Sequence, residues 1–191
     1  MYAENIKREI EKSTYVDYGE YLKDLLMKAE IDSFVPKYLN RIAQLTNKSN
    51  QFNLTTKRYS LKEIEDATED EKKLTLYGKL EDKFGDNGVV SVLIGTKKGT
   101  ALHMDLWLMS CRVLKRDMEY AMMDTLVRKC KEQGIKTIIG YYYPTIKNEM
   151  VKDFYSKMGF RKIREDESHN TTWEFSLNDP YTEKCEVIKI A

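Results

Sequence analysis

The chain has 191 residues, 33% of them charged and 41% hydrophobic, and its 32 Lys and Arg residues nearly balance its 31 Asp and Glu residues. This balance argues against sequence-blind binding to nucleic acid, which needs a basic excess, and no apolar run approaches the ~20 residues that span a membrane. Three widely spaced cysteines (Cys111, Cys130 and Cys185) and two histidines indicate reduced thiols in a cytoplasmic protein without a metal site. The length predicts one domain with an appendage.

Residues 1–46 are predicted to form a helical arm or linker. Apolar residues recur at helical spacing at Ile6 and Ile10 and again from Tyr18 to Ala29, and Pro36 suits the first turn of a third helix. These helices carry too little apolar surface to fold alone. We therefore expect them to pack on the following domain or on a segment outside this sequence.

Residues 47–179 are predicted to form the main domain, followed by a tail at 180–191. Its first half reads as a strand near 52–56, a short helix opened by a capping box at Ser60 and Glu63, and three strands. Those strands are expected at 74–77, 89–94 and 102–113, and Asn87-Gly88 is expected to form the hairpin turn between the first two. Three hairpin-linked strands predict an antiparallel sheet.

The second half of the domain alternates helices and strands. Apolar residues from Met118 to Cys130 predict a helix closed by Gly134, and 137–142 reads as a buried strand suited to parallel pairing. A helix is expected at 146–158, and two final strands at 161–164 and 171–177. The fold class that follows is α/β (α+β), with a mixed central sheet flanked by helices behind an N-terminal helical arm.

The strand, turn and helix from Leu106 to Leu126 have the arrangement that holds a phosphate on helix N-terminal amides. Arg112, Lys115 and Arg116 lie at that turn and add positive charge. These cations predict a local anion site, although a solvated basic face is the simpler alternative.

The element order β–α–β–β–β–α–β–α–β–β resembles the GCN5-related N-acetyltransferase (GNAT) fold. The run from Asn148 to Phe160 matches the pattern N-x-x-A-x-x-L-Y-x-x-x-G-F of that family, with Val151 and Phe154 as variants. Three stretches, 47–59, 109–119 and 143–148, are more narrowly similar to the C-terminal GNAT-like half of FkbH-like proteins. Those proteins also carry a phosphatase-like half of the haloacid dehalogenase type, whose D-x-D motif is absent from this sequence, so their loading of a glyceryl unit onto a carrier protein is not carried over.

The resemblance implies acyl transfer from a pantetheine thioester, on acetyl-CoA, another acyl-CoA or an acyl carrier protein, to an amine or hydroxyl. Tyr155 matches the tyrosine that can protonate the departing thiolate, and Asp105 is nominated as general base or amine anchor from its position on the strand beside the pantetheine. The strand and turn would bind the pantetheine and pyrophosphate, and no metal is implied. The cofactor-binding residues implied are Leu108, Met109, Ser110, Cys111, Arg112, Val113, Lys115, Arg116, Asp117, Met118 and Asn148.

The turn departs from the GNAT pattern Q/R-x-x-G-x-G/A, because Lys115 and Asp117 stand where the family has small residues. At a helix start, the Asp117 carboxylate is expected to cap the free amides and to repel phosphate. We therefore expect weak or shifted coenzyme A binding, with a carrier-protein pantetheine as the natural donor. A second hypothesis is a non-catalytic module that docks a carrier protein or a phosphatase-like partner.

Each of these residues also has a simpler interpretation. Tyr155 could be core packing, Asn148 a helix cap, and Asp105 the partner of a lysine. Cys111 at a strand end is most simply a small buried hydrophobic residue, and His103 a residue near a turn without catalytic duty. The acceptor substrate and the oligomeric state are not indicated by the sequence.

Overall fold

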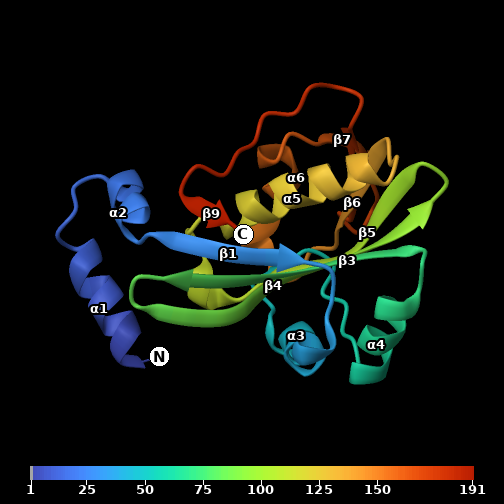
Figure 1. The fold of residues 1–191 in the computed structure, drawn as a ribbon. Coiled ribbons are helices and arrows are strands. Elements are labelled where there is room, and N and C mark those ends of the chain that lie inside the picture. Colours follow the sequence, from blue (N-terminus) through green and yellow to red (C-terminus); the bar gives the residue numbers. More distant parts are fainter. Residues whose placement is uncertain (1) are drawn as a thin grey trace.

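The computed structural model describes residues 2–191, which form a mixed β-sheet with helices on both faces (Figure 1). The strand order is β7-β8-β6-β5-β4-β3-β1-β9, and the short β2 pairs with β5 off this path. The strands are β1 (Met27–Asp32), β2 (Phe52–Asn53), β3 (Lys73–Asp82), β4 (Gly85–Lys98), β5 (Ala101–Met109), β6 (Thr137–Tyr142), β7 (Arg161–Glu165), β8 (Thr171–Ser176) and β9 (Ile188–Ile190). The helices are α1 (Tyr2–Lys12), α2 (Tyr18–Asp24), α3 (Leu39–Lys48), α4 (Leu61–Glu69), α5 (Met118–Glu132) and α6 (Phe154–Lys157), with 3-10 turns at Pro36–Tyr38, Cys111–Val113 and Glu149–Val151. The predicted class, a mixed central sheet flanked by helices, is confirmed.

The sheet separates two hydrophobic cores. Helices α5 and α6 cover one face, and α3 and α4 cover the other (Figure 1). Strand β5 supplies both, because successive side chains of a strand point to opposite faces: Trp107 packs in the first core, whereas Leu106 and Leu108 pack in the second. This central strand therefore contributes side chains to the cores on both faces of the sheet.

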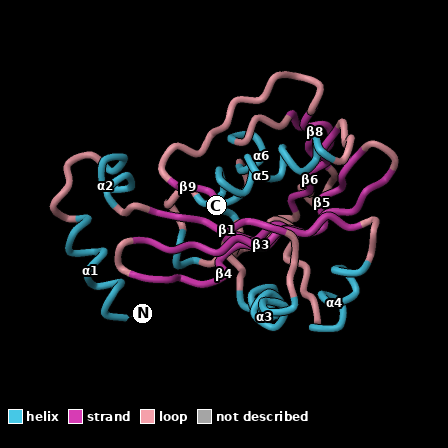
Figure 2. The backbone as a smooth tube through the Cα atoms, viewed as in Figure 1, coloured by secondary structure: helices cyan, strands magenta, loops and turns pink. Residues whose placement is uncertain are grey.

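The N-terminal segment is only partly helical. Helices α1 and α2 form as expected, but residues 27–29, predicted to continue the second helix, belong to β1 (Figure 2). In this strand, buried and exposed residues alternate strictly, and Ala29 pairs with Leu80 of β3. The period of two in this short stretch outweighs the helical spacing. The sheet therefore begins at Met27, and the predicted boundary at residues 46 and 47 falls within α3.

The hairpin between β3 and β4 turns earlier than predicted. Asp82 pairs with Gly85, so Lys83 and Phe84 form the turn, and the Asp82 carboxylate accepts the Phe84 amide at 2.9 Å. Gly88, at φ +69°, instead lies where the register of β3 and β4 shifts. Positive φ suits a bulge as well as a turn, which is why the expectation at Asn87-Gly88 was wrong.

Several other local predictions are confirmed, and one helix is shorter than expected. The capping box at Ser60 and Glu63 opens α4, and β5 and β6 pair in parallel. The helix expected at 146–158 is broken into a 3-10 turn and the short α6. Within residues 2–191, no helix is both long and apolar enough to cross a membrane. The C-terminal tail ends in β9, which pairs in parallel with β1.

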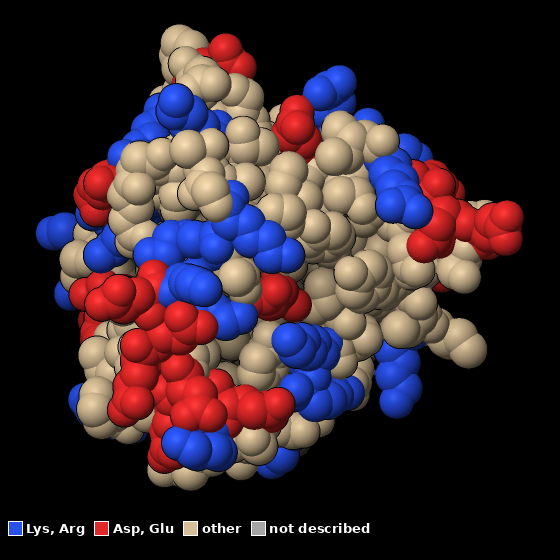
Figure 3. Space-filling view, turned by 90° about the vertical axis from the view of Figure 1, so that its right-hand side faces the viewer, with Lys and Arg blue, Asp and Glu red and all other residues tan. Residues whose placement is uncertain are grey.

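Charges that balance in number are separated in space. Figure 3 shows acidic side chains gathered in the lower part of one face, where Figure 1 places α4. Helix α4 and the turn after it contribute Glu63, Glu65, Asp66, Glu69, Asp70 and Glu71. The near-zero net charge therefore hides strongly charged local surfaces.

Candidate functional site

Strands β5 and β6 separate, and a distant part of the chain fills the gap between them. The two strands pair only through Ala101–His103 and Thr137–Ile139. Beyond this point the segment Phe52–Leu54, which we call the inserted segment, runs antiparallel to the end of β5.

Both edges of the inserted segment are hydrogen-bonded. The Leu54 amide donates to the Trp107 carbonyl at 3.1 Å, and the Tyr143 amide donates to the Leu54 carbonyl at 2.9 Å. Phe52 pairs with Met109, and its neighbour with Leu108. The edge of β5 that the resemblance assigns to pantetheine is thus paired with the chain itself.

Asn148 links the inserted segment to the loop after β6 through hydrogen bonds. Its side chain is fully buried, and its amide nitrogen donates to the main-chain oxygens of Asn53 at 2.9 Å and Tyr143 at 3.0 Å. Its side-chain oxygen accepts the Thr145 amide at 2.7 Å. It makes no side-chain cap on the following 3-10 turn, so the simpler cap interpretation is wrong. Its polar atoms face the inserted segment and its own loop.

Tyr155 lies inside the first core. Its side chain is 1% exposed, and it packs so closely on Gly140 that a Cβ there would lie 2.4 Å from the ring. The hydroxyl approaches the Tyr141 backbone without a hydrogen bond of normal geometry. Burial raises the pKa of Tyr155 well above its ordinary value. The structure therefore holds a neutral phenol with no contact to solvent.

Asp105 and His103 line a separate cavity of about 520 Å³ on one side of β5, together with Tyr141 and Tyr143. Asp105 accepts from the Lys73 ammonium at 2.9 Å, so the lysine pairing is confirmed. The Nδ1 atom of His103 lies 2.7 Å from the Tyr141 hydroxyl.

His103 is suited to accept a proton at neutral pH. Burial, helped by Lys98 and opposed by Asp105, lowers its pKa, so the ring is neutral near pH 7. Sequence reasoning assigned this residue no duty. The sequence did hold a signal that His103 and Asp105 lie in one site. They are two residues apart on one strand, and such residues point to the same face of the sheet.

The turn after β5 has an unusual backbone. Lys115 and Asp117 have φ values of +64° and +61°, in the left-handed region. Asp117 does occupy the N-cap position of α5, but its side chain makes no capping hydrogen bond. The expectation that it caps the amides is wrong, because a capping residue needs extended backbone. Burial, and then Glu186, raise the pKa of Asp117. Val113 and Met118, on either side, are core residues.

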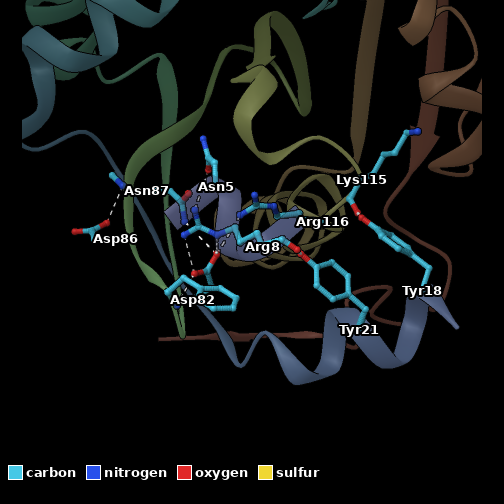
Figure 4. Close-up of polar contacts among 11 residues, drawn as sticks. Asn5, Arg8, Tyr18, Tyr21, Asp82, Asp86, Asn87, Lys115 and Arg116 are labelled. Carbon is cyan, nitrogen blue, oxygen red and sulfur yellow. Dashed lines mark hydrogen bonds and ion pairs between the residues drawn. The ribbon is translucent and has the colours of Figure 1, made fainter. Parts of the chain in front are cut away.

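The N-terminal helices hold this turn through a buried ionic cluster (Figure 4). The Asp82 side chain, 0% exposed, accepts two bonds of 2.8 Å from Arg8 of α1 and one of 3.1 Å from Arg116 of the turn. The Tyr18 hydroxyl of α2 donates to the Lys115 carbonyl at 2.6 Å. Arg116, predicted to attract phosphate, is therefore already paired with a buried carboxylate, which it shares with Arg8.

Coenzyme A, the group that the resemblance implies, does not fit this arrangement. The inserted segment occupies the edge of β5, and the turn offers Lys115 and Asp117 where close phosphate approach needs small residues. Arg116 is already paired with Asp82. Among residues 2–191, no group of three or more His, Cys, Asp or Glu side chains could hold a metal ion.

Four of the predicted cofactor-binding residues line another cavity, of about 640 Å³, at the open end of β5. They are Met109, Ser110, Cys111 and Arg112, and the cavity also takes in parts of 48–52 and 146–147. The expectation that Cys111 is buried is wrong, since its free thiol belongs to an exposed residue. The three stretches that resemble FkbH-like proteins meet here, although they are far apart in the sequence.

Comparison with solved structures identifies the fold family of this chain. A scan against models of protein families and a search of curated proteins each find no match. Solved structures do match. An acetyltransferase of the GNAT family from Streptococcus pneumoniae has a TM-score of 0.61 and 12% identity, covering 78% of this chain and 99% of that chain. The PaiA N-acetyltransferase from Thermoplasma acidophilum, in complex with coenzyme A, has a TM-score of 0.56 and 15% identity over 78% and 99% of the two chains.

A third match is the ribosomal-protein-S18-alanine N-acetyltransferase from Escherichia coli, with a TM-score of 0.59 and 11% identity over 83% of this chain and 99% of that chain. The chain therefore has the GNAT fold, as predicted. At these identities the similarity establishes architecture, and function has to be argued from the site.

Proposed function

We propose that this chain is a GNAT-fold module that docks an acyl carrier protein and is catalytically weak with free acyl-CoA. The observation that carries this proposal is the inserted segment, which is hydrogen-bonded to Trp107 on one side and Tyr143 on the other. A conventional coenzyme A site along this edge of β5 would require those bonds to break.

The turn after β5 supports a carrier protein over coenzyme A as the source of pantetheine. A carrier-protein arm has no nucleotide and needs no pyrophosphate cradle. The turn is closed by Arg116 pairing with Asp82 and by Tyr18 bonding to Lys115. The meeting of the three FkbH-like stretches at one cavity supports the same partner, since that resemblance is to proteins that work with carrier proteins.

Calorimetry tests the proposal. Acyl carrier proteins of the source organism would be titrated in holo and apo form, in parallel with acetyl-CoA. We expect one holo form to bind in the micromolar range, its apo form at least tenfold more weakly, and acetyl-CoA not at all up to millimolar concentration. Tighter binding of acetyl-CoA than of every holo carrier protein would overturn the proposal.

A second candidate is an acyltransferase that acylates an amine or hydroxyl. The cavity lined by His103, Asp105 and Tyr141 favours it, because a neutral imidazole there could take the proton of an acceptor amine. Tyr155 would be its general acid, as the GNAT pattern implies. Release of free thiol from acetyl-CoA or an acylated carrier protein, across a panel of amines, tests it. Turnover that both His103→Gln and Tyr155→Phe abolish supports this reading, and no turnover refutes it.

The remaining parts of the proposal are a thioester-bearing partner and a cytoplasmic location. Cys111, Cys130 and Cys185 are all free thiols, which is consistent with a reducing compartment. Localisation of a tagged full-length protein by fractionation tests this part.

A further inference from the structure

The 640 Å³ cavity at the open end of β5 has a positively charged lining. Four cationic residues line it, and no Asp or Glu does: Arg41 and Lys48 from α3, Arg112 from the turn after β5, and Lys147 from the loop before Asn148. We call it the cationic pocket. Within residues 2–191, none of the four forms an ion pair with an acidic side chain.

The two arginines are near enough to act on each other. Burial, followed by the charge of Arg112, lowers the pKa of Arg41. The Arg41 guanidinium donates a hydrogen bond to Gln44, a neutral side chain. This differs from the Arg8 and Arg116 pair, which shares the buried carboxylate of Asp82. Like charges gathered in a concave site raise its affinity for an anion.

The rest of the lining limits the shape of the anion. Leu45, Phe52, Met109 and Ile146 supply apolar surface, and Ser49 and Ser110 are among the neutral polar residues. The volume lies in the range of about 300–1,000 Å³ that is usual for small-molecule sites. The pocket therefore suits an anionic group joined to a short stem of mixed polarity, and a bare inorganic ion would leave most of it unused.

We propose that the cationic pocket binds a phosphate ester on a short stem, and that the 4′-phosphopantetheine arm of a carrier protein is this ligand. The planar fork of arginine matches phosphate oxygens, and two arginines from different elements can hold one phosphate from two sides. The site shares Arg112 with the turn where the GNAT resemblance expects pyrophosphate, but its other cations, Arg41, Lys48 and Lys147, lie outside that turn, and Lys115 and Asp117 do not line it. The choice of the carrier-protein arm rests on the proposed function, whereas the phosphate-ester site itself does not.

Cys111 provides a reporter inside the pocket, because its free thiol is exposed and lines the cavity. Its thiolate attacks the methylene carbon of iodoacetate or iodoacetamide, and iodide leaves. The two reagents differ in charge, so a positive local potential speeds the anionic one relative to the neutral one. The rate ratio at Cys111, read by peptide mass spectrometry, should fall at least threefold in Arg112→Gln and in Arg41→Gln and should fall with added salt.

Arg164→Gln is the matched control, since Arg164 is exposed on β7 and does not line the cationic pocket. Its rate ratio should equal that of the unaltered protein. A ratio that is the same in all variants would overturn the claim of a cationic site. Thermal melts of each variant check that the fold is retained.

Calorimetry under reducing conditions tests the ligand with 4′-phosphopantetheine, pantetheine and inorganic phosphate. We expect 4′-phosphopantetheine to bind at least tenfold more tightly than either of the others. Arg41→Gln and Arg112→Gln should each weaken it about tenfold, and Arg164→Gln should leave it unchanged. Equal binding of pantetheine and 4′-phosphopantetheine, or inorganic phosphate binding as tightly, would overturn the assignment.

The same variants separate this inference from the proposed function. If 4′-phosphopantetheine binds through the two arginines but no holo carrier protein binds, the pocket stands and the proposed function fails. If a holo carrier protein binds equally well to Arg41→Gln, Arg112→Gln and the unaltered chain, the proposed function stands and the pocket is not the site of its arm.

Discussion

The side-chain amide of Asn148 donates a hydrogen bond of 2.9 Å to the main-chain oxygen of Asn53, 95 residues earlier in the chain. With the Tyr143 amide on the Leu54 carbonyl, it holds the inserted segment against the loop after β6. A residue that the resemblance assigns to cofactor binding thus holds the inserted segment, which pairs with the edge of β5 that the same resemblance assigns to pantetheine.

Replacing Asn148 with Ala should lower the free energy of unfolding by about 2–3 kcal/mol, because buried main-chain groups lose their partners. Urea denaturation measures the loss. Asn170→Ala is the control, since Asn170 bonds to Asp166 on an exposed turn, and it should change stability by less than about 0.5 kcal/mol.

Hydrogen exchange adds a local readout for Asn148→Ala. The Leu54 and Tyr143 amides bond across the inserted segment, so they should exchange faster in the variant, while amides in the centre of α5 change only as global stability does. Unchanged protection at Leu54 and Tyr143, beyond the global effect, would contradict the fastening role.

Tyr155→Phe should leave the free energy of unfolding unchanged or raise it by up to about 1 kcal/mol, because it removes a buried hydroxyl that lacks a partner. The control is Tyr181→Phe, whose hydroxyl donates to Asp124 at 2.6 Å. That variant should lose about 1–2 kcal/mol. A loss of similar size in Tyr155→Phe would show that the hydroxyl has a structural partner. Loss of thiol release without loss of stability would favour the acyltransferase reading.

The sequence predicted correctly those elements that are determined by residues close together in the chain. The capping box at Ser60 and the apolar face of α5 are encoded within a few neighbouring residues, and both are present. The β1 strand was missed because a six-residue stretch satisfies both the helical and the strand period, and its pairing with β3 decides between them. Strand signals did mark the region of Phe52, but not its partners.

The candidate site was harder to predict for the same reason. The position of Phe52–Leu54 depends on hydrogen bonds to Trp107 and Tyr143, which lie more than 50 residues later in the sequence. No local sequence pattern encodes such pairing. The GNAT pattern correctly indicated the fold but could not show that the Tyr155 hydroxyl is buried. Nor could the charges of the turn show that Arg116 is paired with Asp82.

Asp82 should make stability depend on acid pH. Burial raises its pKa, but the bonds from Arg8 and the Phe84 amide, and the charge of Arg116, outweigh burial and lower it. A carboxyl with a lowered folded pKa contributes stability above its unfolded value near 4, and this is lost as pH falls through the folded value. Asp82→Asn should therefore cost about 3–5 kcal/mol at pH 7, because it leaves two guanidinium groups without their shared partner.

Urea denaturation from pH 7 to pH 3 checks this expectation. The stability gap between Asp82→Asn and the unaltered protein should narrow toward pH 3. Asp66→Asn is the control, because Asp66 forms an exposed pair with Lys62, and such pairs contribute at most about 1 kcal/mol. A gap that is constant with pH would show that the Asp82 carboxylate does not supply the stability.

Asp117→Gly separates backbone strain from charge at the turn after β5. Asp117 and Lys115 both have positive φ, so glycine at either position should stabilise the fold by about 1 kcal/mol. Only Asp117→Gly also removes the carboxylate that we expect to repel phosphate at the start of α5. Thermal melts should therefore shift upward in both variants. Calorimetry with acetyl-CoA should show stronger binding in Asp117→Gly alone, because Lys115→Gly keeps the carboxylate and loses a cation. Tight acetyl-CoA binding by the unaltered protein, or equal gains in the two variants, would show that the Asp117 carboxylate is not what weakens the turn as a phosphate site.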